Sequence, residues 1–414
     1  VLTRMESFYG EHDTVWAGFG DGVEVESATL IGRGWEMPYK HPRYPDSSGV
    51  NAGTVHQNRF DPRERELMAD LEARGARADF YFAAGPHAMF APLLGVPYPR
   101  LTGRRLQMLH ANGVRNVAHL GGTPLPGIVP FDPNHEMVGA FQFDPKLDID
   151  RETERMAERK VGSELSSTLL SAWSDAEEAI LAYPNAIPLY SMYGFVWYRL
   201  WARPFVPNIE AIPESERAYY QEFMCTTPHN PNNVDLSRDV LFHLTTLESC
   251  RENLAFFDAN VWKPIDCAIK LLGCECQGMD HASGARNVIY DQWIRLRALK
   301  CWFRTQRSVV AWVVGVHGFL EAYEARDRGA MSECRVLLRD MMLQEIANSE
   351  DLLKLLVSGV EFMATTDQQE TPLIHGRNLD VLLNKRLTLM RAHLDDQPFI
   401  DSSYMERKAA QAVD

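Results

Sequence analysis

Three short apolar stretches decide the fold that this sequence predicts, and each runs into polar or aromatic residues: Thr29-Leu-Ile-Gly-Arg-Gly-Trp-Glu36, Asp79-Phe-Tyr-Phe-Ala-Ala-Gly-Pro-His87 and Arg115-Asn-Val-Ala-His-Leu-Gly-Gly-Thr123. A helix-like segment between the second and third stretches ends at Asn112-Gly113, a pair typical of a helix C-terminus. Strands that alternate with helices are typical of a parallel α/β sheet, which presents chemistry at the carboxyl ends of its strands. We therefore expect such a sheet within residues 1–150.

The rest of the chain, residues 151–414, is predicted to form a mostly helical domain. Apolar residues recur at helical spacing over 151–183, which predicts a long amphipathic helix or a helix pair. An aromatic-rich connector is expected over 184–240, and a helix over 61–75 begins at Asp61-Pro62. Further helices are predicted over 254–272, 286–327, 330–357 and 377–394.

The number of strand candidates bears on the kind of sheet. A closed (β/α)8 barrel takes about 250 residues, whereas residues 1–150 offer only three or four strand candidates. Either the chain holds only part of a barrel, or its sheet is small and open. We favour the first, and a chain that starts at Val1 fits it. The expected fold is therefore α/β plus α: the C-terminal part of a (β/α)8 TIM-type barrel, followed by the helical domain.

Composition limits the classes of partner. The 414 residues carry a formal net charge of -14, which argues against a sequence-independent grip on nucleic acid or on an anionic membrane. No apolar run approaches the roughly 18 residues of a membrane span. Seven cysteines without regular spacing favour reduced thiols and a cytoplasmic setting. Cys274 and Cys276 have only His281 nearby, so we expect no metal site there.

Glu36 is the leading candidate for acid–base chemistry. It follows Trp35 at the end of the first stretch, and a carboxylate against an indole has its charged form disfavoured, which raises its pKa. The alternative is a structural ion pair between Glu36 and Arg33 or Arg43.

Two histidines, His87 and His119, end the next two stretches. Their imidazoles could donate hydrogen bonds to sugar hydroxyls or exchange protons. A buried histidine bonded to a backbone carbonyl is the alternative for each.

Two further carboxylates, Asp132 and Glu136, could face Glu36 across a glycosidic bond, as in the two-carboxylate scheme of glycoside hydrolysis. Asp132-Pro133 could equally cap a helix, with Glu136 near the helix start. The aromatic residues over 190–205 also allow two interpretations, because they suit either stacking on sugar rings or a contact between two domains.

Several stretches carry a resemblance to a known group of enzymes: Phe141-Gln-Phe-Asp-Pro-Lys-Leu-Asp-Ile-Asp150, Ala172-Trp173-Ser-Asp-Ala-Glu-Glu-Ala179 and Arg203-Pro-Phe-Val-Pro207. Their order resembles bacterial glycoside hydrolases with a (β/α)8 barrel and a helical C-terminal domain, of the hexosaminidase-like and α-glucuronidase-like kind. In that group this pattern marks the exit from the last barrel strand. The paired Asp-Glu of the substrate-assisted hexosaminidases is absent from this sequence.

The leading hypothesis is a glycosidase that acts on an oligosaccharide or glycoside without a cofactor. Glu36 would be the proton donor and Asp132 or Glu136 the second carboxylate. The sugar subsite would be shaped by Trp35, Tyr81, His87 and His119. The alternative is a non-catalytic carbohydrate-binding or assembly protein that keeps a barrel remnant and uses its helical domain for partners. The helical domain could also join copies of the chain in a homo-oligomer. A metal hydrolase using His and Asp at strand ends is a third hypothesis.

Overall fold

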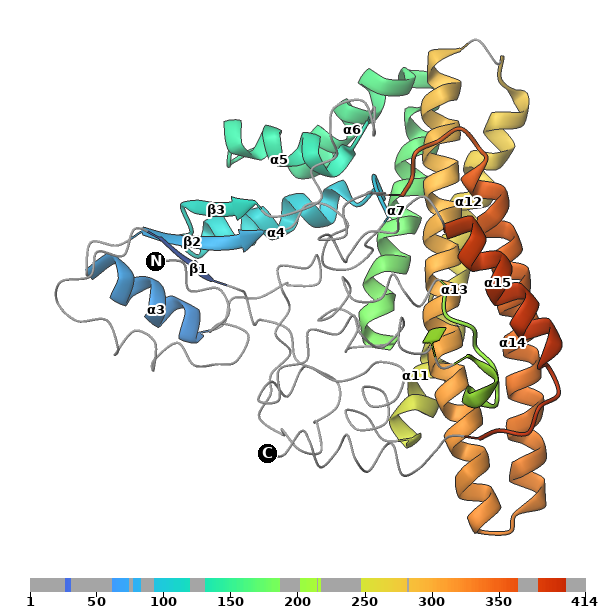
Figure 1. Ribbon diagram of the computed structural model, residues 1–414. Coiled ribbons are helices and arrows are strands. Elements are labelled where there is room, and N and C mark those ends of the chain that lie inside the picture. The colour runs from blue at the N-terminus through green and yellow to red at the C-terminus, as the bar shows by residue number, and fades with distance from the viewer. Residues whose placement is uncertain are drawn as a thin grey trace.

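The computed structural model shows a protein built mainly of helices (Figure 1). It describes residues 27–30, 62–73, 77–82, 93–119, 131–186, 202–213, 215–216, 247–280, 283–363 and 379–399. Among the helices in these ranges, none combines the length and the apolar character needed to cross a bilayer.

A small parallel sheet lies in the amino-terminal part. Its strands are β1 (Ser27–Leu30), β2 (Arg77–Phe82) and β3 (Asn116–His119), in the order β1-β2-β3. Helix α3 (Pro62–Ala73) comes between the first two strands, and α4 (Pro99–Ala111) between the last two. The predicted order of strand and helix is therefore confirmed in this part.

The predicted barrel is wrong. In the part of the chain that the structure describes, three short strands make an open sheet and nearly all other elements are helices. The stretch from Phe141 to Asp150, which the resemblance placed at the exit from the last barrel strand, begins inside helix α5 (Pro133–Phe143). The reason is local: Asp132 accepts hydrogen bonds from the first free N–H groups, and Pro133 at the first helical position has no N–H to lose.

The helices of the second half follow the predicted pattern with one exception. The helix pair over 151–183 is α6 (Ile149–Val161) and α7 (Ser163–Ala186), separated at Gly162 with a φ of 80°. Three later helices match their predicted ranges: α13 (Gly284–Glu324), α14 (Arg328–Leu356) and α15 (Leu379–Ala392).

The exception is the predicted single helix over 254–272, which was wrong. The chain instead forms α11 (Leu247–Asn260) and α12 (Trp262–Gly278). Pro264 explains the break, because a proline ring clashes with the carbonyl four residues earlier, here that of Asn260. In the first turn of α12 the same proline costs nothing, since no intrahelical bond is lost there.

Helix α13 forms the centre of the hydrophobic core. All its residues from Ser308 to Phe319 are buried, as expected for a helix surrounded by others. Helix α14 packs along one side of it and α7, α11 and α12 along others (Figure 1). The core also includes Phe131, whose ring centre lies 5.8 Å from that of Trp173 on α7. The hydrophobic core therefore contains residues from both sides of residue 150. The division of the chain into two domains at that residue stays a prediction.

The buried Arg295 side chain joins three distant parts of the chain. Its Nε and Nη2 donate to the Asp291 carboxylate at 2.7 and 2.8 Å. Its Nη1 donates to the carbonyl oxygens of Leu94 and Glu361 at 2.7 and 3.2 Å. Gly95, with a φ of 65°, lies directly on the guanidinium, where a Cβ would come within 2.9 Å of Nη1. The segment that leads into α4 is thereby fixed to α13.

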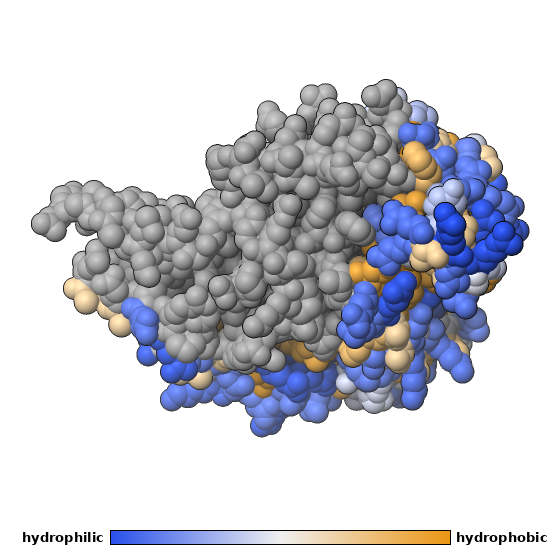
Figure 2. Space-filling view, turned by 90° about the horizontal axis from the view of Figure 1, so that it is seen from below, coloured by the Kyte–Doolittle hydropathy of each residue, from blue (hydrophilic) through white to orange (hydrophobic). Residues whose placement is uncertain are grey.

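The surface of the described helices is mainly hydrophilic on the face shown in Figure 2, with hydrophobic residues visible between hydrophilic ones. A few large apolar side chains are exposed to solvent. The most exposed is Phe143 at the end of α5, at 94%.

Gly315 should not tolerate alanine, because α13 and α14 approach closely there. A Cβ at this position would lie 2.4 Å from Leu338 Cγ, and Leu338 is itself buried. We expect Gly315→Ala to lower the free energy of unfolding by about 1–3 kcal/mol, offset in part by the better helix propensity of alanine. Gly139→Ala on α5 is the matched control, since a Cβ there meets nothing within 4 Å, and it should stabilise slightly. Urea denaturation of both variants measures the difference, and equal stabilities would contradict the close approach.

Candidate functional site

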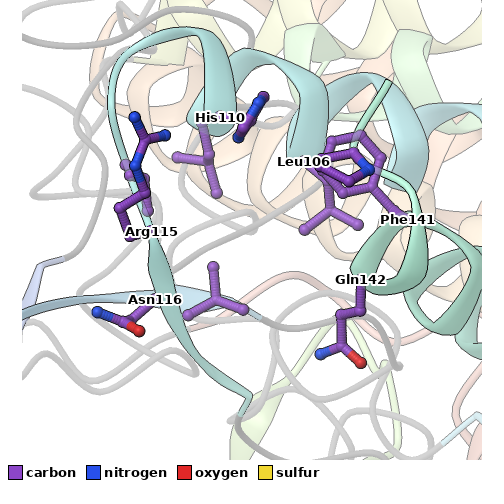
Figure 3. A pocket seen from close by; sticks show the side chains of 10 residues that line it. Leu106, His110, Arg115, Asn116, Phe141 and Gln142 are labelled. Carbon is purple, nitrogen blue, oxygen red and sulfur yellow. The ribbon is translucent and has the colours of Figure 1, made fainter. Parts of the chain in front are cut away.

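A pocket of about 540 Å³ opens where α4, β3 and α5 meet (Figure 3). Figure 3 shows Arg115 and Asn116 on the strand side, His110 above them, and Phe141 and Gln142 on the opposite side. The described residues that line it are Leu106, Leu109, His110, Val114, Arg115, Asn116, Val117, Phe141, Gln142 and Pro145.

Helix α4 brings the first side of the pocket into place and is held at both ends. At its start, Tyr98 offers no side-chain cap, and Glu177 from α7 accepts hydrogen bonds from the backbone N–H groups of Arg100 and Leu101 at 2.8 and 3.4 Å. At its end, Gly113 adopts a φ of 88°, a left-handed conformation that favours glycine. After this turn the chain continues directly to Arg115 and Asn116, which line the pocket.

Helix α5 brings the opposite side. Asp132 accepts from the N–H groups of Asn134 and His135 at 2.9 and 3.2 Å. The Asn134 side chain then accepts from Tyr98 N–H and donates to the Val96 carbonyl, both at 2.7 Å. The starts of α4 and α5 are therefore bonded to each other, which fixes the width of the pocket between them.

The chemistry of the pocket combines apolar faces with neutral and basic polar groups. Phe141 and His110 meet edge to face with ring centres 6.2 Å apart. Asn116 and Gln142 supply amides, which both donate and accept hydrogen bonds. Arg115 is exposed, and no ion pair to it occurs in the described part of the chain. Among the lining residues that the structure describes, none carries a carboxylate.

The two predicted carboxylates of this region lie outside the pocket lining. Asp132 is 8% exposed and caps α5; burial raises the pKa of its carboxyl, while the hydrogen bonds from the His135 and Asn134 N–H groups lower it. Glu136 forms ion pairs with Lys160 at 2.7 Å and Arg159 at 3.6 Å. The structure thus shows the helix-capping alternative for Asp132, and catalytic roles for these two residues stay predictions.

The other predicted site residues are placed only in part. Tyr81 lies in β2 and His119 in β3, where their backbone partners across the strands are Ala118 and Phe82. Trp35, Glu36 and His87 lie outside the described residues. The hydrolase hypothesis depends on Glu36 and stays a prediction.

Sequence reasoning missed the polar residues that the pocket brings together. Arg115 and Asn116 were visible as the polar start of a predicted strand, directly after the Asn112-Gly113 turn. Gln142 gave no such signal, because its stretch was interpreted as leading out of a barrel strand rather than as the last turn of a helix. Within the described ranges, no group of three or more His, Cys, Asp or Glu side chains could hold a metal ion.

Comparisons with protein-family models, curated proteins and solved structures found no match. The resemblance to glycoside hydrolases with a (β/α)8 barrel is therefore not supported, and the mainly helical build contradicts it. The function must be argued from the pocket itself.

Proposed function

We propose that the protein binds a carbohydrate in the pocket between α4, β3 and α5, without cleaving it. The observation that carries this proposal is the composition of the lining: among its described residues, apolar faces and hydrogen-bonding amides stand together and no carboxylate is present. A glycosidase needs a pair of carboxyl groups at the bond that it cleaves.

The size and shape of the pocket fit a sugar unit. Its volume of about 540 Å³ falls within the range of small-molecule sites. A pyranose ring has an apolar face, which Phe141 and the leucines of α4 can cover, and a rim of hydroxyls, which the amides of Asn116 and Gln142 can bind. Phe143 follows Gln142 with its ring 94% exposed, so an aromatic face is available close by for a further sugar unit.

The charges in the pocket favour an acidic sugar over a neutral one. Arg115 contributes a planar guanidinium, and no acidic side chain opposes it among the described lining residues. Guanidinium groups bind carboxylates through two parallel hydrogen bonds, which are stronger than bonds between neutral groups.

Replacement of Arg115 tests this assignment. We expect glucuronate to bind more tightly than glucose, from which it differs only by the carboxylate. Arg115→Gln should weaken glucuronate binding by about tenfold or more, the effect of one charge-assisted hydrogen bond, and should leave glucose binding unchanged. Isothermal titration with both sugars measures the two affinities.

The matched control is Arg104→Gln. Arg104 is also exposed on the same part of the fold but does not line the pocket, and its contact with Asp150 is long, at 4.0 Å. The Arg104→Gln variant should bind both sugars as the parent does. Failure of the parent to bind either sugar, or equal glucuronate affinities for Arg115→Gln and the parent, would reject the proposal. Release of reducing sugar from a glycoside would favour the hydrolase hypothesis instead.

A further inference from the structure

A second pocket, of about 460 Å³, lies between the junction of α11 with α12 and the outer faces of α13 and α14. It is separate from the sugar pocket, since the two share no lining residue. Three basic residues of α13 enter its lining. The described lining residues are Asp258, Trp262, Asp266, Lys300, Arg304, Arg307, Gln344 and Ala347.

Two of the three basic residues are firmly paired. Arg307 donates to both oxygens of Asp258 at 2.5 and 2.7 Å. Asp258 also accepts from Trp262 Nε1 at 3.2 Å, so this wall of the pocket is fixed. Lys300 forms an ion pair with Asp266 on α12. The charges of Arg307 and Lys300 are therefore already balanced.

Arg304 differs from its two neighbours. It lies four residues after Lys300 and three before Arg307, so all three share one face of α13. Its nearest carboxylate is that of Asp351, at 3.8 Å from Nη1, which is too long for a hydrogen bond. In the part of the chain that the structure describes, no hydrogen bond to its guanidinium is found, and its side chain is 36% exposed. The guanidinium group of Arg304 is thus available to a ligand in the pocket.

We propose that this pocket binds a small organic carboxylate through Arg304. Three basic and two acidic side chains are among the described lining residues, and Asp351 beside them is shared between Arg304 and Lys354. This group of four basic and three acidic side chains leaves one positive charge to balance. A carboxylate carries one negative charge and matches the guanidinium fork in shape, whereas a phosphate monoester carries nearly two at neutral pH. Gln344 supplies an amide beside it, and the half-buried Trp262 supplies an aromatic wall for the rest of the ligand.

Three probes that share a phenyl ring separate the possibilities: benzoate, benzamide and phenyl phosphate. We expect benzoate to bind the parent protein, benzamide to bind at least about tenfold more weakly because it lacks the charge, and phenyl phosphate to bind no better than benzoate. Ligand-observed NMR titration gives the three affinities. Arg304→Gln should lower benzoate affinity by about tenfold or more and bring it level with benzamide.

Arg297→Gln is the matched control for that variant. Arg297 is a half-buried arginine of the same helix whose guanidinium lies 4.8 Å from the Trp293 ring centre, outside the pocket. It should bind benzoate as the parent does. Equal binding of benzoate and benzamide, or unchanged benzoate binding in Arg304→Gln, would overturn the proposal, and tighter binding of phenyl phosphate would replace it with a phosphate site. The probe comparison on the parent decides the question even where a variant does not fold.

Discussion

Arg386→Leu is expected to lower the free energy of unfolding by about 3–5 kcal/mol, because it leaves a buried carboxylate without its counter-ion. Arg386 Nη2 donates to Glu345 Oε1 at 2.6 Å, and the two side chains are 1% and 0% exposed. The same oxygen accepts from Thr305 Oγ1 at 2.7 Å and from Asn348 Nδ2 at 3.1 Å. The ion pair therefore lies at the centre of a network that joins α13, α14 and α15.

The neighbouring residue gives a matched control for this effect. Lys385 is 56% exposed, and its contact with Glu216 spans 3.5 Å, so Lys385→Leu should change stability by about 0.5 kcal/mol or less. Adding Glu345→Gln to Arg386→Leu removes the uncompensated charge and keeps an acceptor for Thr305 and Asn348, so the double variant should be more stable than Arg386→Leu alone. Chemical denaturation measures all three. Similar losses for Arg386→Leu and Lys385→Leu would contradict the buried ion pair.

Glu177→Gln is expected to stabilise the protein at alkaline pH by about 3 kcal/mol at most and to remove part of its pH dependence. Burial raises the pKa of the Glu177 carboxyl from 4.5 to about 7, against the opposing effects of Arg100, of the two backbone hydrogen bonds and of Arg104. The folded state therefore keeps the proton between these two values while the unfolded state loses it. The stabilisation from this group is fully present below about pH 4.5 and is lost as the pH rises through about 7.

Glutamine suits this position because it cannot ionise but can still accept the hydrogen bonds from Arg100 and Leu101 that start α4. Glu178→Gln, at the adjacent and exposed position, is the control and should follow the parent at every pH. Denaturation curves recorded from below pH 4.5 to above pH 7 measure the effect. If the stability of the parent protein falls across this interval no more than that of Glu177→Gln, the raised pKa of the Glu177 carboxyl is contradicted.

The features that sequence predicted well are those set by neighbouring residues. Asn112-Gly113 ends α4, and Pro62 begins α3. Each acts within one helical turn, so its effect is independent of the rest of the fold. Local signals of this kind could not test the barrel. Alternating apolar residues predict a strand, but they do not show how many strands pair in the same sheet.

The pockets were harder to predict for a related reason. His110 and Gln142 lie at the ends of different helices and both line the pocket. Their helices are held by contacts between distant residues, because Asn134 at the start of α5 accepts from Tyr98 N–H and Glu177 accepts from Arg100 N–H at the start of α4. Glu345 and Arg386 are 41 residues apart, and neither has a local signal that predicts the other. Contacts of this kind depend on the packing of the whole bundle.

The Arg295 side chain has a consequence for the order in which the chain folds. Its carbonyl partners lie 201 residues before it and 66 residues after it, so both contacts close large loops. The hairpin of α13 and α14 needs only the short turn at residues 325–327. Loop entropy therefore favours this hairpin as the early nucleus, onto which the segment around Leu94 docks late.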